Sequence, residues 1–430
     1  MKNKIIHGDC REEMKKLESN SIDAIVTDPP AGISFMGKEW DNKGSLISFQ
    51  DFICESFTEA IRVLKPGGHC IVWAIPRTSH HTAMGLERAG FEVRDVLIHL
   101  FGSGFPKSHN IGKKIDEIQG NERELIEVKH KANISVPGSN EGWKRPSHYN
   151  DDGSPKTRLE ITKGNSEWEG WGTNLKPASE HWVLCRKPLS EKNVALNVLK
   201  HGTGGINIDA CRIGSEIHKV NVNDFSNIHS NKYGSGAKIK TLSYREQQGR
   251  FPSNVILSEE AGKMLDEQSG ISNGEIGRVG RKSAGEYDNT SFKVGVVTKT
   301  GIKDKGGASR FFYCAKPSRA ERNIGLEYSK IPEKLIPINE PHNSKDLEER
   351  YKMTSKNFHP TCKSIALMQY LIKLVTREGA LVLDPFGGSG TTMIACLKLN
   401  RKCILIEKEL EYIEIAKARI KPFMDQKVLK

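Results

Sequence analysis

Apolar and polar positions over the first 110 residues alternate in the manner of strands and helices in an α/β protein. Short apolar runs at IIHGDC (5–10) and IDAIV (22–26) predict strands, and the charged segment REEMKKLES (11–19) between them predicts a helix. The apolar residues of DFICESFTEAIRVLK (51–65) fall roughly on one face of a second helix. The next expected elements are a PGG turn and the strands HCIVWAI (69–75) and FEVRDVLIHLF (91–101).

This pattern stops after residue 110 and returns at residue 364. Residues 111–175 and 212–308 are polar with sparse apolar periodicity, and we expect them to be irregular apart from short pieces such as HWVLCRKP (181–188) and RFPSNVIL (250–257). Alternating helices and strands are then expected again at IALMQYLIKLVT (365–376), ALVLD (380–384), TTMIACLKLN (391–400), CILIE (403–407) and ELEYIEIAKARI (409–420). Material for one sheet therefore lies at both ends of the chain.

Composition narrows the class of protein. The 430 residues suggest two or three domains, and 65 Lys plus Arg against 53 Asp plus Glu give a net charge of +12, which favours a polyanionic partner. The nine Cys form no C-x-x-C pair, so we expect reduced thiols, no disulfides and no metal site. Neither an apolar leader nor an uninterrupted apolar run of about 18 residues is present, which indicates a cytoplasmic protein without a membrane span.

The segment ALVLDPFGGSGTT (380–392) predicts a ligand site at the carboxyl end of a strand. A glycine-rich turn before a helix start presents backbone N–H groups to a ligand. The Lys of a P-loop is absent, and Met393 stands at the third Gly position of a dinucleotide fingerprint. Glu407 ends the next strand, 19 residues after Gly388, where a carboxylate accepts hydrogen bonds from ribose hydroxyls. The alternative is that the glycines only tighten a turn and Glu407 is a solvated strand end.

Together with TDPPAGISFMGKEW (27–40), this segment resembles the β class of S-adenosylmethionine-dependent DNA amino-methyltransferases. In that class a DPPY-type catalytic motif comes first, the target recognition region follows, and the cofactor-binding motif is last, which is the order found here. NFHPTCKSIALM (357–368) is similar to the family's HPTxKP segment, with Ser364 in place of the second Pro, and residues 175–189 and 201–213 look like stretches of phage and prophage members. The resemblance covers residues 1–110, 175–213 and 357–420.

The resemblance implies a Rossmann-like, doubly wound methyltransferase sheet with an inserted, irregular target recognition region. The implied division is a catalytic half of the core (1–110), an insertion with DNA contacts (111–174), a core return segment (175–213), the target recognition region (214–350) and the cofactor-binding half (351–430). Some arginines of the middle are expected to reach base edges, namely Arg145, Arg212, Arg245, Arg250, Arg278, Arg281 and Arg310. A solvated surface is the alternative for each of them.

The implied reaction is methyl transfer to adenine N6 of a base flipped out of duplex DNA. Asp28 and the carbonyl of Pro29 would accept the two protons of the target amine, with Pro30 stiffening the turn. The implied cofactor-binding residues are Asp9, Cys10, Asp28, His359, Thr361, Lys363, Asp384, Pro385, Phe386, Gly387, Gly388, Ser389, Gly390, Thr391, Thr392 and Glu407. His359, Thr361 and Lys363 have ordinary helix-entry caps as their alternative.

Position 31 departs from the family motif. The family has an aromatic residue there, usually Tyr, against which the flipped base stacks, whereas Ala31 has no ring. We expect impaired activity, and we favour a Tyr-to-Ala substitution over a natural protein that has lost or relocated its function because the other motifs are intact. Phe35 and Trp40 are the candidate replacements for the missing ring, and the alternative for both, which we prefer, is local packing.

Several alternatives of function and partner remain open from the sequence. A cytosine N4 methyltransferase, a catalytically dead DNA-binding pseudoenzyme and a methyltransferase of RNA or protein glutamine all fit parts of the pattern. Adenine is preferred because family members with Asp at the first motif position mostly methylate adenine. The resemblance allows a homodimer and a cognate restriction endonuclease as partners, and a nucleoid-associated location.

Overall fold

The computed structural model describes most of the chain. The described residues are 3–34, 39–42, 44–102, 104, 108–130, 158–222, 243–273, 305–315, 319–327, 329, 331, 334–336, 353–359 and 361–425. They divide into two compact units, one formed by Met1–Ser103 with Ala178–Lys430 and the other by Gly104–Pro177.

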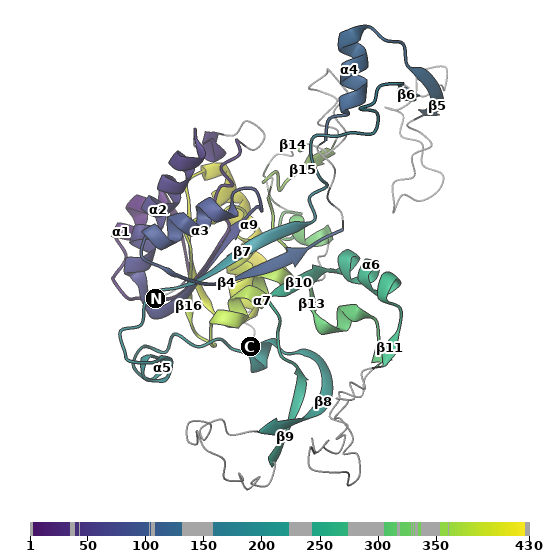
Figure 1. Cartoon of the computed structure of the whole chain (residues 1–430). Helices are drawn as coiled ribbons and strands as arrows, with labels where there is room; N and C mark the ends of the chain where they lie inside the picture. Colours follow the sequence, from purple (N-terminus) through teal and green to yellow (C-terminus); the bar gives the residue numbers. More distant parts are fainter. Residues whose placement is uncertain are drawn as a thin grey trace, which may run out of the picture. The chain divides into compact units, whose positions relative to one another are not determined.

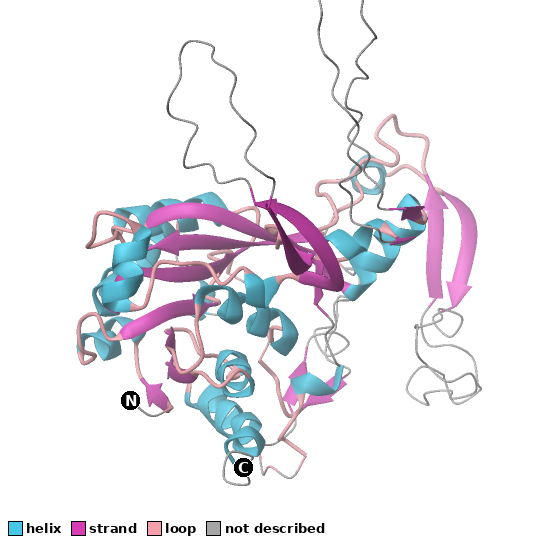
Figure 2. Ribbon diagram, turned by 90° about the horizontal axis from the view of Figure 1, so that it is seen from below, coloured by secondary structure: helices cyan, strands magenta, loops and turns pink. Residues whose placement is uncertain are grey.

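A nine-stranded sheet forms the centre of the first unit (Figure 1, Figure 2). Its strands lie in the order β1 (Lys4–His7), β17 (Lys402–Glu407), β16 (Leu381–Asp384), β2 (Ile22–Thr27), β3 (Leu64–Ala74), β7 (Ser179–Arg186), β4 (Glu92–Leu100), β10 (Val255–Ser258) and β13 (Tyr313–Ala315). Neighbours are parallel except that β7 runs antiparallel to β3 and to β4. The α/β fold built from both ends of the chain is thus confirmed.

Helices cover both faces of this sheet. One face packs against α1 (Cys10–Lys15), α2 (Leu46–Val63) and α3 (Ser79–Arg88), and the other against α7 (Ile365–Val375), α8 (Thr391–Lys398) and α9 (Leu410–Asp425). Successive side chains of a strand point to opposite faces, so Ile25 joins the first apolar cluster and Val26 the second. Both are fully buried. This two-sided burial explains why the central strands are apolar throughout rather than alternating.

The boundary between β16 and β2 is a topological switch point. From β2 the chain continues through α2 to β3, and from β16 it continues through α8 to β17, which lies on the opposite side. The two connections therefore diverge at the carboxyl ends of β2 and β16. Ligands of open α/β sheets usually bind at such a switch point.

Serine caps begin two of the sheet-covering helices. Ser45 precedes α2 and accepts a hydrogen bond from the Ser48 N–H, so α2 begins at Leu46, one turn earlier than the apolar pattern predicts. The pattern misses this turn because Leu46 and Ile47 are exposed. Ser364 caps α7 in the same way through the Leu367 N–H.

The PGG segment (66–68) is not the expected turn. It lies within β3, where the register against β2 shifts between Ile22 and Ala24. Gly67 has a φ of +74° there, a conformation that glycine adopts without strain.

The middle of the chain is more regular than its polar composition predicts. The second unit contains α4 (Ile111–Gln119) and the antiparallel strands β5 (Glu124–His130) and β6 (Arg158–Lys163). The pattern misses these elements because apolar residues such as Ile118 and Leu125 stay exposed. The remaining elements described in the first unit are η2 (Glu39–Asp41), α5 (Val194–His201), η5 (Asp209–Cys211), β8 (Ile213–Val222), β9 (Ser243–Arg250), α6 (Glu259–Ser269), β11 (Ser272–Asn273), β12 (Lys305–Gly306), η7 (Ala308–Phe311), η8 (Arg319–Arg322), β14 (Lys334–Ile336) and β15 (Met353–Ser355).

Within the described part of the chain, no helix has both the length and the apolar character that a membrane crossing requires.

Candidate active site

The two sequence motifs meet at the switch point. Asp28 follows β2 and Asp384 ends β16, and these strands pair in parallel with Ile25 beside Leu383. The hydroxyl of Thr27 donates a 2.6 Å hydrogen bond to the Asp384 carboxylate. Residues 357 positions apart in the sequence are thereby joined at one edge of the sheet.

The glycine turn after β16 is held by backbone hydrogen bonds. The Gly387 N–H donates to the Ile406 carbonyl at 2.8 Å, and the Gly390 N–H donates to the Gly387 carbonyl at 2.9 Å. Gly388 has a φ of +50°, and a Cβ there would lie 2.8 Å from Nε2 of His359. A Cβ at this position would overlap the His359 ring, so Gly388 allows both the positive φ and the close packing of His359 against this turn, which we call the glycine cradle.

Asp384 fastens the turn rather than facing a ligand. Its buried carboxylate accepts hydrogen bonds from the hydroxyls of Thr27 and Thr392 and from the Phe386 N–H. Burial raises its pKa, and the three donors oppose that rise. The carboxylate therefore links β2, β16 and α8.

Glu407 reaches the glycine turn from the next strand. One carboxylate oxygen accepts the Gly388 N–H at 2.7 Å, and the other accepts the Glu409 N–H at 2.8 Å. Burial raises the pKa of Glu407. A carboxylate has about four lone-pair sites, so these two backbone donors leave capacity for two hydroxyl groups. This arrangement fits the ribose-binding role expected for Glu407.

Asp9 and Cys10 follow β1 beside the same strand. His7 pairs with Glu407 in the sheet, and the Gly8 N–H donates to the Glu407 carbonyl. Asp9 caps α1 through the Arg11 N–H and forms an ion pair with Arg11 at 3.0 Å, and these bonds lower the pKa of Asp9. Burial raises the pKa of the Cys10 thiol to about 12. Cys10 is therefore a neutral, apolar wall at this edge.

His359 and Thr361 lie against the glycine turn. The His359 ring packs beside Gly388 and meets Tyr412 edge-on, with 4.4 Å between ring centroids. Burial lowers the pKa of His359 to about 3, with nearby cations adding to the effect. The imidazole is thus neutral at pH 7, and its Nδ1 accepts the Thr361 N–H at 3.3 Å.

Arg419 supports the turn, although no motif in the sequence marks it. It lies in α9, and its side chain is fully buried. One guanidinium nitrogen donates to the carbonyl and hydroxyl of Ser389 and to the hydroxyl of Thr391. A buried arginine with these partners fixes the backbone of the cradle.

Lys363 lies on the other side of the switch point, next to Asp28. Its ammonium is 3.5 Å from the Asp28 carboxylate, 3.7 Å from the Glu180 carboxylate and 3.8 Å from the ring centroid of Trp73. His99 in turn lies 3.5 Å from Glu180. Glu180, Trp73 and His99 were not predicted as site residues. Trp73 and His99 stand in strand segments without a motif, and Glu180 lies in the family-like stretch 175–189, for which no site role was implied.

The charged groups around Lys363 shift the pKa values of Asp28 and Glu180. Burial raises the pKa of Asp28 to about 7, helped by Glu180 and Asp384 and opposed by Lys363. Burial alone would also raise the pKa of Glu180, but Lys363 and His99 outweigh it and lower the pKa to about 2. Asp28 is therefore the carboxylate of the site that changes charge near neutral pH.

The backbone after Asp28 is held independently of the side chain at position 31. The Thr78 hydroxyl donates to the Ala31 carbonyl at 2.9 Å, and Asp41 accepts the Gly32 N–H at 2.8 Å and the Ile33 N–H at 3.1 Å. Ala31 itself is partly buried and packs against the apolar core. Of the two candidate replacement rings, Phe35 lies outside the described residues, and Trp40 lies in η2.

The arginines expected to read bases fall into three groups. Arg145, Arg278 and Arg281 lie outside the described residues, and Arg245 lies in β9. Arg212 pairs with Asp209 at 2.8 Å. Arg250 and Arg310 both lie over the Phe311 ring, at 4.9 and 4.3 Å from its centroid. The Arg250 contact joins the end of β9 to η7, whereas the Arg310 contact lies within η7.

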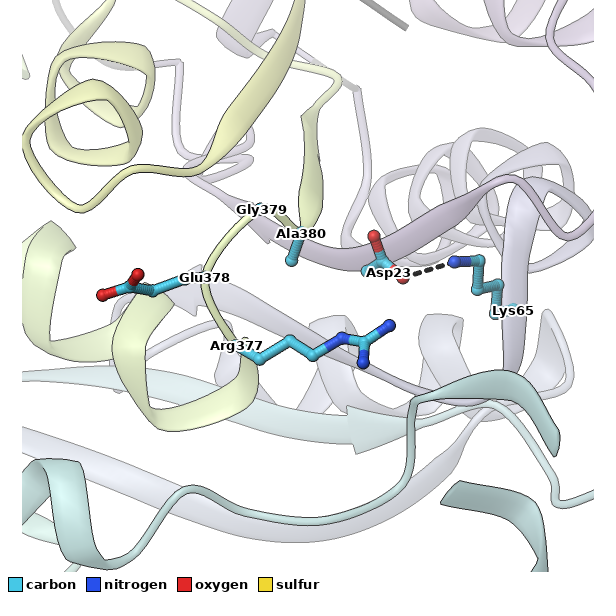
Figure 3. Close-up of a pocket in the computed structure, with 6 residues that line it drawn as sticks. All are labelled: Asp23, Lys65, Arg377, Glu378, Gly379 and Ala380. Atoms are coloured by element: carbon cyan, nitrogen blue, oxygen red, sulfur yellow. Dashed lines mark hydrogen bonds and ion pairs between the residues drawn. The ribbon is translucent and has the colours of Figure 1, made fainter. Parts of the chain in front are cut away.

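A separate polar pocket of about 300 Å³ lies at the opposite, amino-terminal edge of the sheet (Figure 3). Its lining includes Asp23 at the start of β2, whose carboxylate forms a 2.5 Å ion pair with Lys65 and accepts the Leu381 N–H. Arg377 and Glu378 complete much of the wall. This pocket lies near the other end of β2 from Asp28, and neither the Asp-Pro-Pro turn nor the glycines of the second motif line it.

No group of three or more His, Cys, Asp or Glu side chains is arranged to hold a metal ion within the ranges that the structure describes.

Comparisons with known proteins match this geometry to one family. A family model described as DNA methylase, for N6 and N4 methyltransferases, matches residues 22–418. The Type II methyltransferase M2.MboI of Moraxella bovis is 49% identical over 61 residues, which are 14% of this chain and 22% of that protein. M.HindIII of Haemophilus influenzae is 43% identical over 79 residues, 18% of this chain and 26% of that protein. The chain thus matches only about a quarter of the length of these relatives.

Solved structures also match this chain, at low sequence identity and with TM-scores below 0.5. M1.HpyAVI in complex with SAM is 17% identical, with a TM-score of 0.36 over 97% of this chain and 98% of that one. The PvuII cytosine-N4-specific DNA methyltransferase is 11% identical, with a TM-score of 0.42 over 99% of this chain and 91% of that one.

Proposed function

Since the chain belongs to the N6/N4 DNA methylase family, we propose that it is built to transfer a methyl group from S-adenosylmethionine to adenine N6 of a base flipped out of duplex DNA. The observation that carries the proposal is the parallel pairing of β2 with β16, tied by the Thr27–Asp384 hydrogen bond. It sets the Asp-Pro-Pro turn and the glycine cradle side by side. A transfer reaction needs its donor and acceptor sites adjacent in this way.

The cradle fits the cofactor. Gly388 brings its backbone N–H to Glu407, and the Glu407 carboxylate has acceptor capacity left for ribose hydroxyls next to it. When bound, S-adenosylmethionine supplies an electrophilic methyl group. Arg419 keeps the cradle rigid, and the neutral His359 ring closes one of its walls.

Residues of the catalytic half orient the target amine. The Asp28 carboxylate and the Pro29 carbonyl accept the two amine protons, which turns the nitrogen lone pair toward the methyl group. The amine loses a proton after transfer, and Asp28 is the nearest carboxylate to take it. Ala31 leaves the base without a stacking ring, so we propose that this chain is catalytically impaired. Cytosine N4 is the second target under this proposal, because its amine presents the same two protons.

The partners in this proposal rest on the family and on the charge of the chain. Duplex DNA is the proposed substrate, and the net charge of +12 favours phosphate contacts. A homodimer and a cognate restriction endonuclease stay predictions from the sequence resemblance.

Calorimetry tests the cofactor half. We expect the protein to bind S-adenosylmethionine, and the Glu407→Ala variant to bind it at least about tenfold more weakly because charge-assisted hydrogen bonds to the ribose are lost. Glu414→Ala is the control, since this glutamate pairs with Lys417 on the exposed side of α9. Absence of affinity for both S-adenosylmethionine and its demethylated product would refute the proposal.

The pH dependence of the reaction tests Asp28. Because Asp28 has a pKa of about 7 and accepts an amine proton only when ionised, we expect the rate to fall about tenfold per pH unit below 7 and to level off above it. The measurement is the single-turnover rate between pH 5.5 and 8.5, made on an Ala31→Tyr variant to give sufficient signal. A rate that is flat down to pH 5.5 would show that the pKa of Asp28 lies below this range or that Asp28 takes no part in the reaction.

A further inference from the structure

Lys363 occupies the half of the sheet edge that faces the target rather than the cofactor. Its ammonium contacts Trp73 of β3 and Glu180 of β7. In the sheet these strands lie on the side of β2 away from β16 and β17, which carry the glycine cradle and Glu407. The charged end of Lys363 therefore lies at Asp28 and on the β3–β7 side of it, and the cofactor-binding role expected for Lys363 stays a prediction.

The ammonium is held in place but retains donor capacity. It lies between two carboxylates, at 3.5 Å from Asp28 and 3.7 Å from Glu180, and over the face of the Trp73 ring. Charge-assisted hydrogen bonds are shorter, about 2.7–2.9 Å, and a lysine ammonium has three N–H donors. Only 12% of the Lys363 side chain is exposed. A buried cation with free donor capacity beside a catalytic carboxylate suits an acceptor on the substrate.

Resting on the proposed function, we propose that Lys363 reads the target base by donating a hydrogen bond to the ring nitrogen next to the target amine. In adenine this nitrogen is N1, and in cytosine it is N3. Asp28 as acceptor and Lys363 as donor then form an adjacent pair that matches the amine and ring nitrogen of one base edge. Glu180 and Trp73 act as positioning residues for the ammonium.

This pairing gives selectivity for the class of base. Guanine and thymine present a carbonyl oxygen and a ring N–H along the same edge, so their donor and acceptor are reversed relative to Asp28 and Lys363. Each would place a ring N–H against the ammonium and a carbonyl against the carboxylate. A buried donor that faces a donor, and a buried acceptor that faces an acceptor, strongly disfavour binding.

Base analogues in the DNA test the inference. In the Ala31→Tyr variant, we expect 1-deazaadenine at the target position to lower kcat/KM at least about tenfold relative to adenine, because its C–H cannot accept from Lys363. A 7-deazaadenine target is the control, because its ring is also altered but its N1, the proposed acceptor for Lys363, is intact. Adding Lys363→Met should abolish the preference for adenine over 1-deazaadenine while leaving the affinity for S-adenosylmethionine unchanged. For a cytosine target, 3-deazacytosine replaces 1-deazaadenine.

The control variant is Lys65→Met, which removes another partly buried lysine paired with a carboxylate, at the opposite edge of the sheet. The Lys65→Met variant should retain the full preference for adenine over 1-deazaadenine. If Lys363→Met does not fold, Glu180→Gln is the second variant, and we expect it to weaken the preference because Lys363 is then held by one carboxylate fewer. The inference is overturned if a folded Lys363→Met or Glu180→Gln protein keeps the full preference, or if Lys363→Met loses cofactor affinity instead. No methylation by the Ala31→Tyr parent on any DNA would refute the proposed function itself, a separate result.

Discussion

We expect the Ala31→Tyr variant to methylate its target at least about a hundredfold faster than the present chain, which corresponds to ~2.7 kcal/mol of transition-state stabilisation. Stacking of a base on an aromatic ring contributes about 1–3 kcal/mol, and correct alignment of the amine adds to it. The backbone at this position is fixed by Thr78 and Asp41, so the new ring should not disturb the turn. Cofactor affinity should change little.

Sequencing that detects modified bases, run on DNA exposed to both versions, measures this effect. It also yields the recognition site and separates adenine N6 from cytosine N4. Ala31→Leu is the matched control, because it adds apolar volume without an aromatic face and should restore much less activity. Equal activity in the original and the Tyr variant would show that another side chain stacks the base. No activity in either would indicate a pseudoenzyme or a different substrate.

Removing the Asp28 carboxylate from the Ala31→Tyr variant should lower the rate by about 10²–10³-fold. The ring then still holds the base, but one of the two acceptors that direct the amine lone pair is gone. Lys363 would also lose one of its two carboxylate partners. Single-turnover rates of the double variant Ala31→Tyr with Asp28→Ala measure the loss.

Asp23→Ala in the same background is the control for Asp28. This residue lies near the other end of β2 and also pairs with a lysine, Lys65, but it faces the pocket at the amino-terminal edge (Figure 3). Its removal should lower Tm, because the Leu381 N–H loses its acceptor, and should leave the rate nearly unchanged. A double variant with Asp28→Ala that stays as active as Ala31→Tyr would exclude Asp28 from the reaction.

The sequence predicts the core of this fold well where burial dictates composition. IDAIV and ALVLD are apolar throughout because β2 and β16 are covered on both faces, and Glu407, expected at the end of the strand that follows the glycine turn, does end β17. The place of β7 between β3 and β4, antiparallel to both, is set by tertiary pairing and leaves no local pattern.

The parts of the site that the sequence does not predict depend on contacts between distant segments. Glu180 and Trp73 are ordinary strand residues until β7 pairs with β3 and Lys363 lies over them. Arg419 lies in the last helix of the pattern, outside every motif, and it is buried under the glycine turn. Identification of these roles requires the folded geometry, since no motif or spacing marks them.

The joining of β2 to β16 also sets when the protein becomes competent during synthesis. Asp384 is translated 357 residues after Thr27, which takes on the order of tens of seconds at ribosomal speed. Until then β1 and β2 lack their central neighbours β17 and β16, so the nascent chain exposes apolar strand edges that invite chaperone binding or aggregation. A chain stopped before residue 384 would hold the catalytic turn without its partner strand, so premature termination should leave no partially active product.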